Sequence, residues 1–335
     1  MSDVVIRTEK LSKTFVSGFF RKKVRALEDL MLEVRRGEVF GFLGPNGAGK
    51  TTTLKLLVGL CFPTAGRAWV LGQPVPDATS RMRLGFLPET PYFYDYLSGE
   101  EFLELCGRLF GLSAEDRRAR AKRLLEMVGL GDAARRPLRK YSKGMLQRIG
   151  LAQALINDPE LVILDEPMTG LDPIGRKEVR DLILRLKAEG RTVFFSTHIL
   201  PDVELLCDRV GIIAGGRLRD VGPLDSLLAP KVIETEVVLE LPQDVQPSRF
   251  AELGRYVSGP SGSALFVTDS ERTQDFLRAA LQANARVLSV TPRKERLEDI
   301  FLRHVATSKE EAKEEEAKKE EAKKEEAKTQ AGGAQ

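Results

Sequence analysis

The chain has 335 residues, of which 42% are hydrophobic, and its 52 basic and 49 acidic side chains leave a formal charge of only +3. Since single cores seldom grow past roughly 250 residues, this length predicts one large domain with a smaller appendage, and the charge balance does not indicate a nucleic-acid-binding protein. The sequence lacks both a basic, apolar leader and any apolar window of about 18 residues. We therefore expect a cytoplasmic chain that does not itself span a membrane.

Three cysteines, Cys61, Cys106 and Cys207, are widely spaced and form no Cys-x-x-Cys pair. An odd and scattered set argues against both a disulfide framework and a zinc site. We expect these residues to be small buried side chains.

The first clear element is an apolar run at residues 39–43, which ends in a loop at 44–51 and continues with helical spacing to residue 60. The loop fits the pattern Gly, four residues, Gly-Lys-Thr, in which glycines let backbone N–H groups surround a phosphate. Lys50 is expected to bind the β- and γ-phosphates of ATP, and Thr51 to hold Mg²⁺. The alternative is an ordinary glycine-rich turn. The predicted nucleotide-binding residues of this segment are Gly44, Pro45, Asn46, Gly47, Ala48, Gly49, Lys50, Thr51 and Thr52.

A helical insertion is predicted between about residues 90 and 158. Residues 98–111 and 115–128 carry apolar side chains at spacings of three and four, the period of an amphipathic helix. The outer face of this insertion is available for a partner.

Two further apolar runs, at residues 161–164 and 192–195, lack alternation and so indicate parallel strands buried on both faces. Asp165 and Glu166 follow the first run directly, at the sheet edge where ligands of α/β folds bind. We expect Asp165 to be a partner of Mg²⁺ and Glu166 to polarise the water that attacks the γ-phosphate. The alternative is a carboxylate pair that caps a helix. The first domain, residues 1–230, is therefore predicted to be α/β.

Beyond residue 230 the pattern changes. Short strands and helices over residues 231–305 predict a small α+β domain. Residues 306–335 are rich in Glu, Ala and Lys, with alanines every five positions that spiral around a helix instead of forming a seam. We expect a solvated, partly helical tail, with a partner-binding segment as the alternative.

Three motifs resemble those of the ABC ATPase family. The segment Tyr-Ser-Lys-Gly-Met at 141–145, followed by Gln147-Arg148, resembles the family's signature; residues 170–172 resemble its D-loop; and residues 196–198 resemble the segment of its switch histidine. The motifs occur in the family's order and spacing. The resemblance implies a P-loop ATPase fold, the ABC nucleotide-binding domain, with a helical insertion and a small C-terminal α+β domain.

The resemblance also implies a head-to-tail dimer in which each ATP lies between one subunit's phosphate loop and the other subunit's signature. Ser142, the Gly144 backbone and Asp172 are then expected at the nucleotide. His198 is implied as the sensor of the γ-phosphate, with a buried, hydrogen-bonded histidine as the alternative. Phe15 matches the aromatic that stacks on adenine, although Phe19 or Phe20 could take its place and Phe15 could instead be a hydrophobic residue at a strand edge.

Two positions depart from the common family pattern. Glu89 stands where the family has a glutamine ligand of Mg²⁺, and its carboxylate can still bind the metal, so the expected metal residues are Thr51, Glu89 and Asp165. In the signature, residues 141, 143 and 145 are Tyr, Lys and Met instead of Leu, Gly and Gln. Both variants resemble those of bacterial exporters whose ATPase and membrane channel are separate chains.

An aromatic cluster at residues 91–96 follows Glu89 and contains Tyr92, Tyr94 and Tyr96. In the family this neighbourhood touches the membrane subunit, and clustered aromatic side chains suit a protein interface. The alternative is packing inside the helical insertion.

The function that the resemblance implies is that of an ATP-hydrolysing subunit of an ABC exporter. The expected partners are a second copy or a paralogue and a separate integral membrane permease, which would hold the chain on the inner face of the membrane; no nucleic acid is expected. A soluble ABC ATPase of DNA repair usually has a long coiled-coil insertion, whereas about 90 residues lie here between the phosphate loop and the signature. A ribosomal ABC ATPase usually has two ATPase domains. A subunit that binds ATP without hydrolysing it would not need Lys50, Asp165, Glu166 and His198 together.

Overall fold

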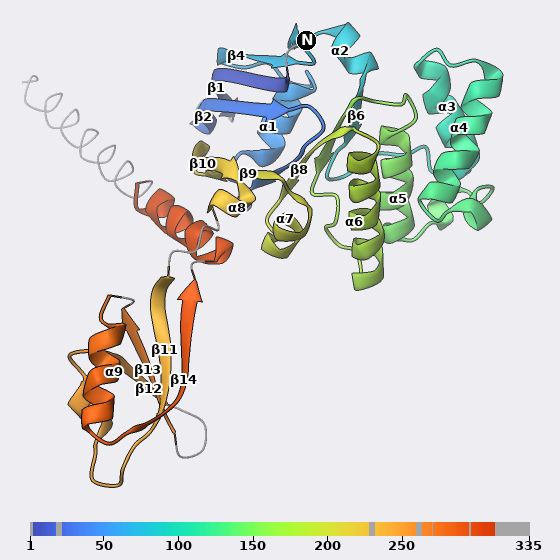
Figure 1. The fold of residues 1–335 in the computed structure, drawn as a ribbon. Helices are drawn as coiled ribbons and strands as arrows, with labels where there is room; N and C mark the ends of the chain where they lie inside the picture. Colours follow the sequence, from blue (N-terminus) through green and yellow to red (C-terminus); the bar gives the residue numbers. More distant parts are fainter. Residues whose placement is uncertain are drawn as a thin grey trace, which may run out of the picture. The chain divides into compact units, whose positions relative to one another are not determined.

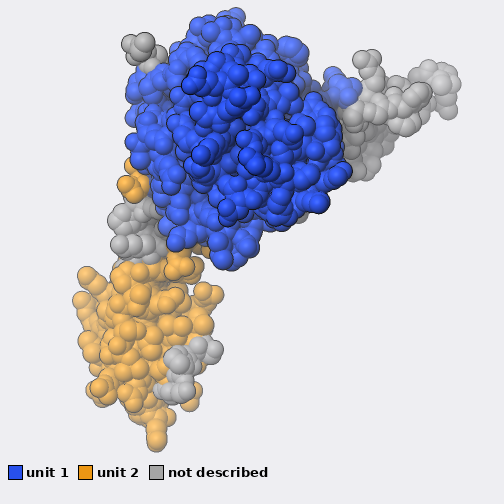
Figure 2. All heavy atoms as spheres, turned by 90° about the vertical axis from the view of Figure 1, so that its right-hand side faces the viewer, with its two compact units in different colours: residues 1–224, 301–335 blue, residues 225–300 orange. Residues whose placement is uncertain are grey.

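The computed structural model describes residues 3–17, 22–227, 232–258, 263–269, 271–294 and 296–311 (Figure 1). The chain divides into two compact units (Figure 2). The larger contains Met1–Leu224 and Phe301–Gln335, and the smaller contains Asp225–Ile300. The domain boundaries expected after residues 230 and 305 stay predictions, and residues 312–335 of the expected tail lie outside the described residues.

The larger unit is built on a six-stranded sheet with the order β10-β9-β3-β8-β7-β6. Five neighbouring strands are parallel, and β10 pairs antiparallel with β9 at one edge. Every residue of β3, β7 and β8 is buried, which explains why their sequences are almost continuously apolar. The strands are β3 (Val39–Leu43), β6 (Leu84–Leu87), β7 (Leu161–Asp165), β8 (Thr192–Thr197), β9 (Arg209–Ala214) and β10 (Arg217–Pro223).

A second, antiparallel sheet of the larger unit has the order β2-β1-β4-β5. Helix α1 (Lys50–Leu57) contacts strands of both sheets, so it fills the layer between them. Phe40, Phe42 and Phe194 of the central sheet point into this layer with the leucines of α1. The strands are β1 (Val4–Ser17), β2 (Lys22–Arg35), β4 (Ala65–Val70) and β5 (Gln73–Pro74).

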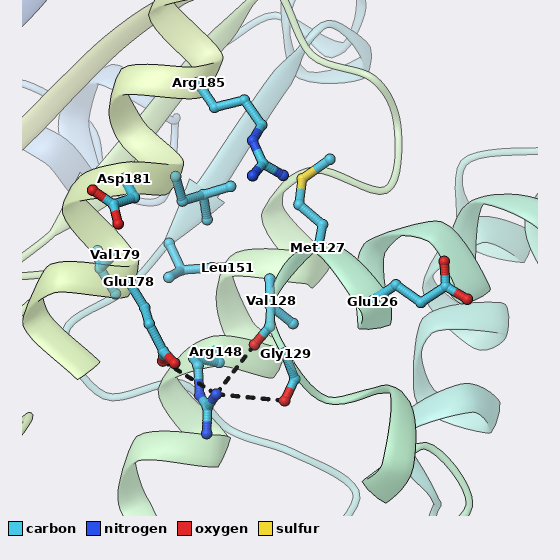
Figure 3. A pocket seen from close by; sticks show the side chains of 11 residues that line it. Glu126, Met127, Val128, Gly129, Arg148, Leu151, Glu178, Val179, Asp181 and Arg185 are labelled. Atoms are coloured by element: carbon cyan, nitrogen blue, oxygen red, sulfur yellow. Dashed lines mark hydrogen bonds and ion pairs between the residues drawn. The ribbon is translucent and has the colours of Figure 1, made fainter. Parts of the chain in front are cut away.

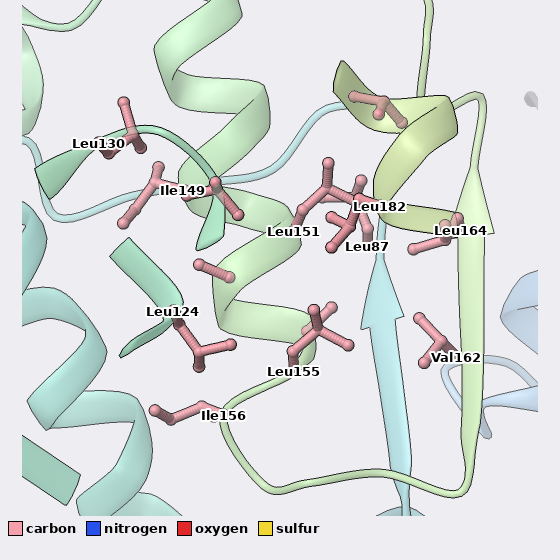
Figure 4. Packing of buried hydrophobic residues seen from close by; sticks show 14 of the residues in the cluster. Leu87, Leu124, Leu130, Ile149, Leu151, Leu155, Ile156, Val162, Leu164 and Leu182 are labelled. Atoms are coloured by element: carbon pink, nitrogen blue, oxygen red, sulfur yellow. The ribbon is translucent and has the colours of Figure 1, made fainter. Parts of the chain in front are cut away.

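The opposite face of the central sheet packs against helices. Because side chains alternate along a strand, Val162 and Leu164 of β7 point away from the α1 layer, into a core with leucines and isoleucines of the helices (Figure 4). Besides α1, the larger unit contains the helices α2 (Ala78–Met82), α3 (Gly99–Leu109), α4 (Ala114–Met127), α5 (Lys143–Ala154), α6 (Pro173–Ala188) and α7 (Leu200–Leu206).

Side-chain caps set where the helices of the insertion begin. Ser98 and Glu101 form a capping box at the start of α3, in which each side chain accepts a hydrogen bond from the backbone N–H of the other. Ser113 and Ser142 cap α4 and α5 in the same position. Figure 1 shows α3 and α4 at the end of the larger unit away from β1, β2 and β4.

The smaller unit is an antiparallel sheet with the order β12-β13-β11-β14. Phe250, Phe266 and Phe276 contact one another in its core, where α9 covers one face of the sheet. Its strands and helix are β11 (Val232–Glu240), β12 (Arg255–Ser258), β13 (Ala264–Asp269), β14 (Arg286–Lys294) and α9 (Thr273–Gln282).

The described residues also form the α-helical segments α8 (Leu224–Leu227) and 297–311, and three 3-10 helices at Gly131–Ala133, Leu138–Lys140 and Pro247–Phe250. Across the part of the chain that the structure describes, no helix is both long enough and apolar enough to cross a membrane. The cysteines differ in burial: Cys106 is buried, whereas Cys61 and Cys207 are half-buried, and all three are free thiols.

Candidate nucleotide-binding site

The phosphate loop joins the carboxyl end of β3 to the first turn of α1. The backbone N–H of Gly44 donates to the Thr197 carbonyl at the end of β8, which ties the loop to the neighbouring strand. Gly47 and Gly49 have φ angles of +79° and +107°, a region that favours glycine. A Cβ on Gly49 would also lie 2.5 Å from the carbonyl oxygen of Ala26, so only glycine fits there.

A cavity of about 280 Å³ opens in front of this loop. Most of its lining comes from the predicted loop residues, although Gly44 and Ala48 are not among the lining residues. Ala26, on β2, is a lining residue that the sequence did not indicate. The lining residues are Ala26, Pro45, Asn46, Gly47, Gly49, Lys50, Thr51, Thr52, Glu89 and Glu166.

Lys50 lies at the base of the cavity, where only 6% of its side chain is exposed. Its ammonium donates to the Gly44 carbonyl oxygen at 2.7 Å and lies 3.1 Å from Glu166 Oε1. The amino end of α1 adds unpaired backbone N–H groups beside this cation. The combination can bind a phosphate anion.

Asp165 and Thr51 meet beside the cavity. The Thr51 hydroxyl hydrogen-bonds the Asp165 carboxylate, and burial raises the pKa of Asp165 while hydrogen bonds from Ser196 and Thr51 oppose that rise. Glu89, which is exposed, lines the same cavity. These oxygen groups fit Mg²⁺, which is usually bound through one or two carboxylates together with substrate phosphates. Within the described ranges no group of three or more His, Cys, Asp or Glu side chains gathers as a metal site, so the protein offers only part of a coordination shell.

Glu166 and His198 are brought together at the cavity wall. The Nδ1 atom of His198 lies 3.0 and 3.1 Å from the two carboxylate oxygens of Glu166, and the Thr169 hydroxyl donates to Oε2 at 3.1 Å. Both distances allow a hydrogen bond, in which the Nδ1–H tautomer of the imidazole would donate to the carboxylate. The His198 side chain is 43% exposed, so it is not the buried histidine of the alternative interpretation.

Ser142, Gly144 and Asp172 do not line the cavity of their own chain. Ser142 is exposed, and its hydroxyl oxygen accepts from the Met145 N–H at the start of α5. Asp172 caps α6 by accepting from the Gly175 N–H at 2.7 Å. One chain therefore presents the signature and the phosphate loop at separate places.

Phe15 also stands outside the residues that line the cavity. It lies on β1 opposite Val24, its side chain is 41% exposed, and the Lys13 ammonium is 5.0 Å from its ring centroid. Phe19 and Phe20, the named substitutes, fall outside the described residues.

The signature's Gln147 and Arg148 make structural contacts that their motif did not specify. The Gln147 amide donates to the Pro167 carbonyl oxygen at 2.9 Å, directly after Glu166. Arg148 lies in a second cavity, of about 240 Å³, between α4, α5 and α6, where it approaches the carbonyl oxygens of Val128 and Gly129 and forms an ion pair with Glu178 (Figure 3).

Comparison with known proteins gives the family. Residues 27–169 match the family model described as ABC transporter. The chain is 45% identical over 304 residues to an uncharacterised ABC transporter ATP-binding protein of Nostoc sp., with 90% of each chain covered. It is 37% identical over 284 residues to the Nod factor export ATP-binding protein I of Ralstonia nicotianae, covering 83% of this chain and 88% of that protein.

A solved structure agrees with the sequence relatives. A dimeric ATP-binding cassette in a post-hydrolysis state, bound to ADP and phosphate, superposes with a TM-score of 0.61 at 26% identity, covering 65% of this chain and 98% of that one. This match confirms the predicted fold class, the ABC type of P-loop ATPase. The chain therefore belongs to the ABC transporter ATP-binding proteins, the ATPase subunits that couple ATP hydrolysis to transport.

Proposed function

We propose that this chain hydrolyses ATP in a head-to-tail dimer and drives export through a separate membrane-spanning subunit. The observation that carries the proposal is the place of Glu166, whose carboxylate lines the cavity of the phosphate loop between Lys50 at 3.1 Å and His198 at 3.0 Å. A carboxylate held there is suited to accept the proton of a water that attacks a bound γ-phosphate.

The charged side chains at the cavity and the Thr51 hydroxyl each have a role in this mechanism. Lys50 and the N–H groups of the loop hold the β- and γ-phosphates. Thr51, Asp165 and Glu89 would hold Mg²⁺, which supplies positive charge to those phosphates when bound. His198, through its Nδ1 proton, orients the Glu166 carboxylate.

We assign Phe15 to the adenine ring. Its side chain is 41% exposed and lies beside the Lys13 ammonium, which supports a place for stacking at the surface. Stacking of this kind contributes about 1 to 3 kcal/mol per base where it has been measured on other proteins.

The second copy would complete the site. Ser142, Gly144 and Asp172 lie away from the cavity of their own chain, while the α5 amino end and the Ser142 hydroxyl are accessible to an anion from outside. The related cassette is a dimer bound to ADP and phosphate, which supports the same assembly here. The second subunit would be another copy of this chain or a paralogue.

The aromatic cluster after Glu89 suits the membrane partner. Tyr92, Tyr94 and Tyr96 are 95%, 55% and 65% exposed, so they are not packed inside the helical insertion. Phe93, in contrast, packs edge-on against Phe102 at 5.3 Å and anchors the segment. We propose that the three tyrosines contact the permease and thereby hold the chain at the inner face of the membrane.

Export is the proposed direction. It is supported by the relative from Ralstonia nicotianae, a Nod factor export ATP-binding protein that matches 83% of this chain. The cargo would be chosen by the membrane subunit.

The variant Glu166→Gln tests the mechanism. We expect it to bind ATP, to lose hydrolysis and to elute as a dimer on size exclusion when ATP is present, because the phosphate contacts persist without turnover. Hydrolysis at the wild-type rate would show that Glu166 is not the catalytic base. An unchanged monomer with ATP bound would contradict the dimer.

A further inference from the structure

The side chain of Ser196 connects the two carboxylate residues of the site. Its hydroxyl donates to Asp165 Oδ1 at 2.6 Å, and its oxygen accepts the backbone N–H of Glu166 at 3.0 Å. A serine hydroxyl has a single hydrogen, so donation to Asp165 fixes the direction of that hydrogen and leaves the lone pairs for Glu166. Ser196 is completely buried, so water does not compete for either contact.

Strand register explains why this residue reaches both neighbours. Strands β7 and β8 are parallel, and Asp165 stands directly beside Ser196 in their pairing. The next hydroxyl along β8, that of Thr197, accepts from the Ile199 N–H, and its side chain points to the other face of the sheet because side chains alternate along a strand.

The backbone at Glu166 needs this support. Its φ angle is +49°, a left-handed conformation that is unfavourable for a residue with a side chain. The hydrogen bond from the Glu166 N–H to Ser196 holds this turn. As a result two adjacent carboxylates diverge: Asp165 meets the Thr51 hydroxyl, and Glu166 lines the cavity with Lys50.

We propose that Ser196 is a positioning residue for ATP hydrolysis, holding Asp165 in the orientation that a divalent cation requires and Glu166 in the orientation that the attacking water requires. The inference rests on the proposed roles of these two carboxylates. Ser196 is completely buried and does not line the cavity, so it would act through the two carboxylates. Its loss should therefore change the geometry of the site while leaving the phosphate loop intact.

Ser196→Ala is the direct test, because it deletes one oxygen atom. Residues that orient metal ligands typically change metal affinity or activity 10- to 100-fold, so we expect the Mg²⁺ concentration for half-maximal binding of a fluorescent ATP analogue to rise about tenfold or more. Binding of the analogue without Mg²⁺ should stay unchanged. In steady-state hydrolysis kcat should fall by a similar factor, with a much smaller change in KM.

A matched control separates positioning from stability. Thr192 lies on the same strand, is also completely buried, and accepts the Gly37 N–H at 2.9 Å, far from the cavity lining. Thr192→Val also deletes a buried hydroxyl and should leave the Mg²⁺ dependence of binding unchanged. Ser196→Thr keeps the hydroxyl and should restore most of the wild-type behaviour, provided that melting shows it to be folded.

The outcomes distinguish this inference from the proposed function. If Glu166→Gln abolishes hydrolysis but Ser196→Ala shifts the Mg²⁺ dependence no more than Thr192→Val, the role of Ser196 is overturned alone. If Glu166→Gln hydrolyses ATP at the wild-type rate, the proposed catalytic role of Glu166 is overturned, and with it the role of Ser196 in positioning that carboxylate.

Discussion

The Lys50 ammonium and the Glu166 carboxylate form a buried ion pair, with 3.1 Å between Nζ and Oε1 and side chains only 6% and 7% exposed. A bound phosphate would compete with Glu166 for this cation. The pair therefore links the proposed phosphate-binding lysine to the proposed catalytic base.

A double-mutant cycle on this pair should give a large coupling energy. Replacing Lys50 alone by Met leaves a buried carboxylate with less compensation, so the single change is costly. When Glu166→Gln is already present, the same change should cost less, with a coupling of about 1 to 3 kcal/mol in the nucleotide-free protein. Chemical denaturation of the four proteins measures it, and additive effects would contradict the contact.

Gly85→Ala should strongly destabilise the larger unit. A Cβ at this position of β6 would lie 1.9 Å from the Ala154 carbonyl oxygen at the end of α5, a contact that neither backbone can relieve easily. We expect a loss of about 3 kcal/mol in the free energy of unfolding, at the upper end for overpacking. Gly131→Ala is the control, because its Cβ would meet only the Glu126 side chain at 3.7 Å. Equal stability of the two variants would argue against close packing of β6 on α5.

Acid should weaken the contacts of Glu160. Hydrogen bonds from Arg83 and Arg36 lower the pKa of Glu160 from 4.5 to about 2 in the folded chain. A lowered pKa means that the ionised form stabilises the fold above pH 4.5 and that this contribution is lost as the pH falls toward 2. Wild type should therefore lose more stability than Glu160→Gln on going from about pH 5 to about pH 3. Parallel losses in thermal melts at the two pH values would contradict the prediction.

Arg148 should stabilise the junction of α4, α5 and α6. Its guanidinium approaches two carbonyl oxygens just past α4 and pairs with Glu178 of α6 at 3.2 Å (Figure 3). Arg148→Ala should cost about 1 to 2 kcal/mol, because the carbonyl contacts are lost along with the ion pair. Glu178→Ala should cost less than about 1 kcal/mol, since its side chain is half exposed. Chemical denaturation of both variants measures the two losses in the free energy of unfolding. A greater loss for Glu178→Ala would contradict the larger contribution assigned to Arg148.

The phosphate loop and the two carboxylates could be predicted because their chemistry is local in sequence. Gly47, Gly49 and Lys50 form one short loop, and Asp165 with Glu166 ends one strand. The contact of His198 with Glu166 depends on the neighbouring strand. The histidine could still be identified as a site residue, because it belongs to a segment that resembles a family motif.

The missed residues depend on contacts between distant segments. Ala26 carries no reactive group, and it reaches the cavity because β2 passes close to Gly49. Ser196 belonged to the motif of the switch histidine, and nothing in the sequence indicated a role of its own. Its two hydrogen bonds follow from the register of β7 and β8, which no local sequence pattern specifies. The place of Phe15 at the adenine stays a proposal, because the ring is not among the residues that line this cavity.

ATP hydrolysis by a mixed dimer tests most directly whether each ATP site is shared between two subunits. Lys50→Ala damages the phosphate loop of one copy and Ser142→Ala the signature of the other, and each variant alone should be nearly inactive. In a head-to-tail dimer the mixed pair has one site with both defects and one intact site. Random mixing should thus restore about a quarter of the wild-type rate if the sites act independently. If each chain instead used its own signature, every site would carry a defect, and a mixture no more active than its parents would contradict the shared site.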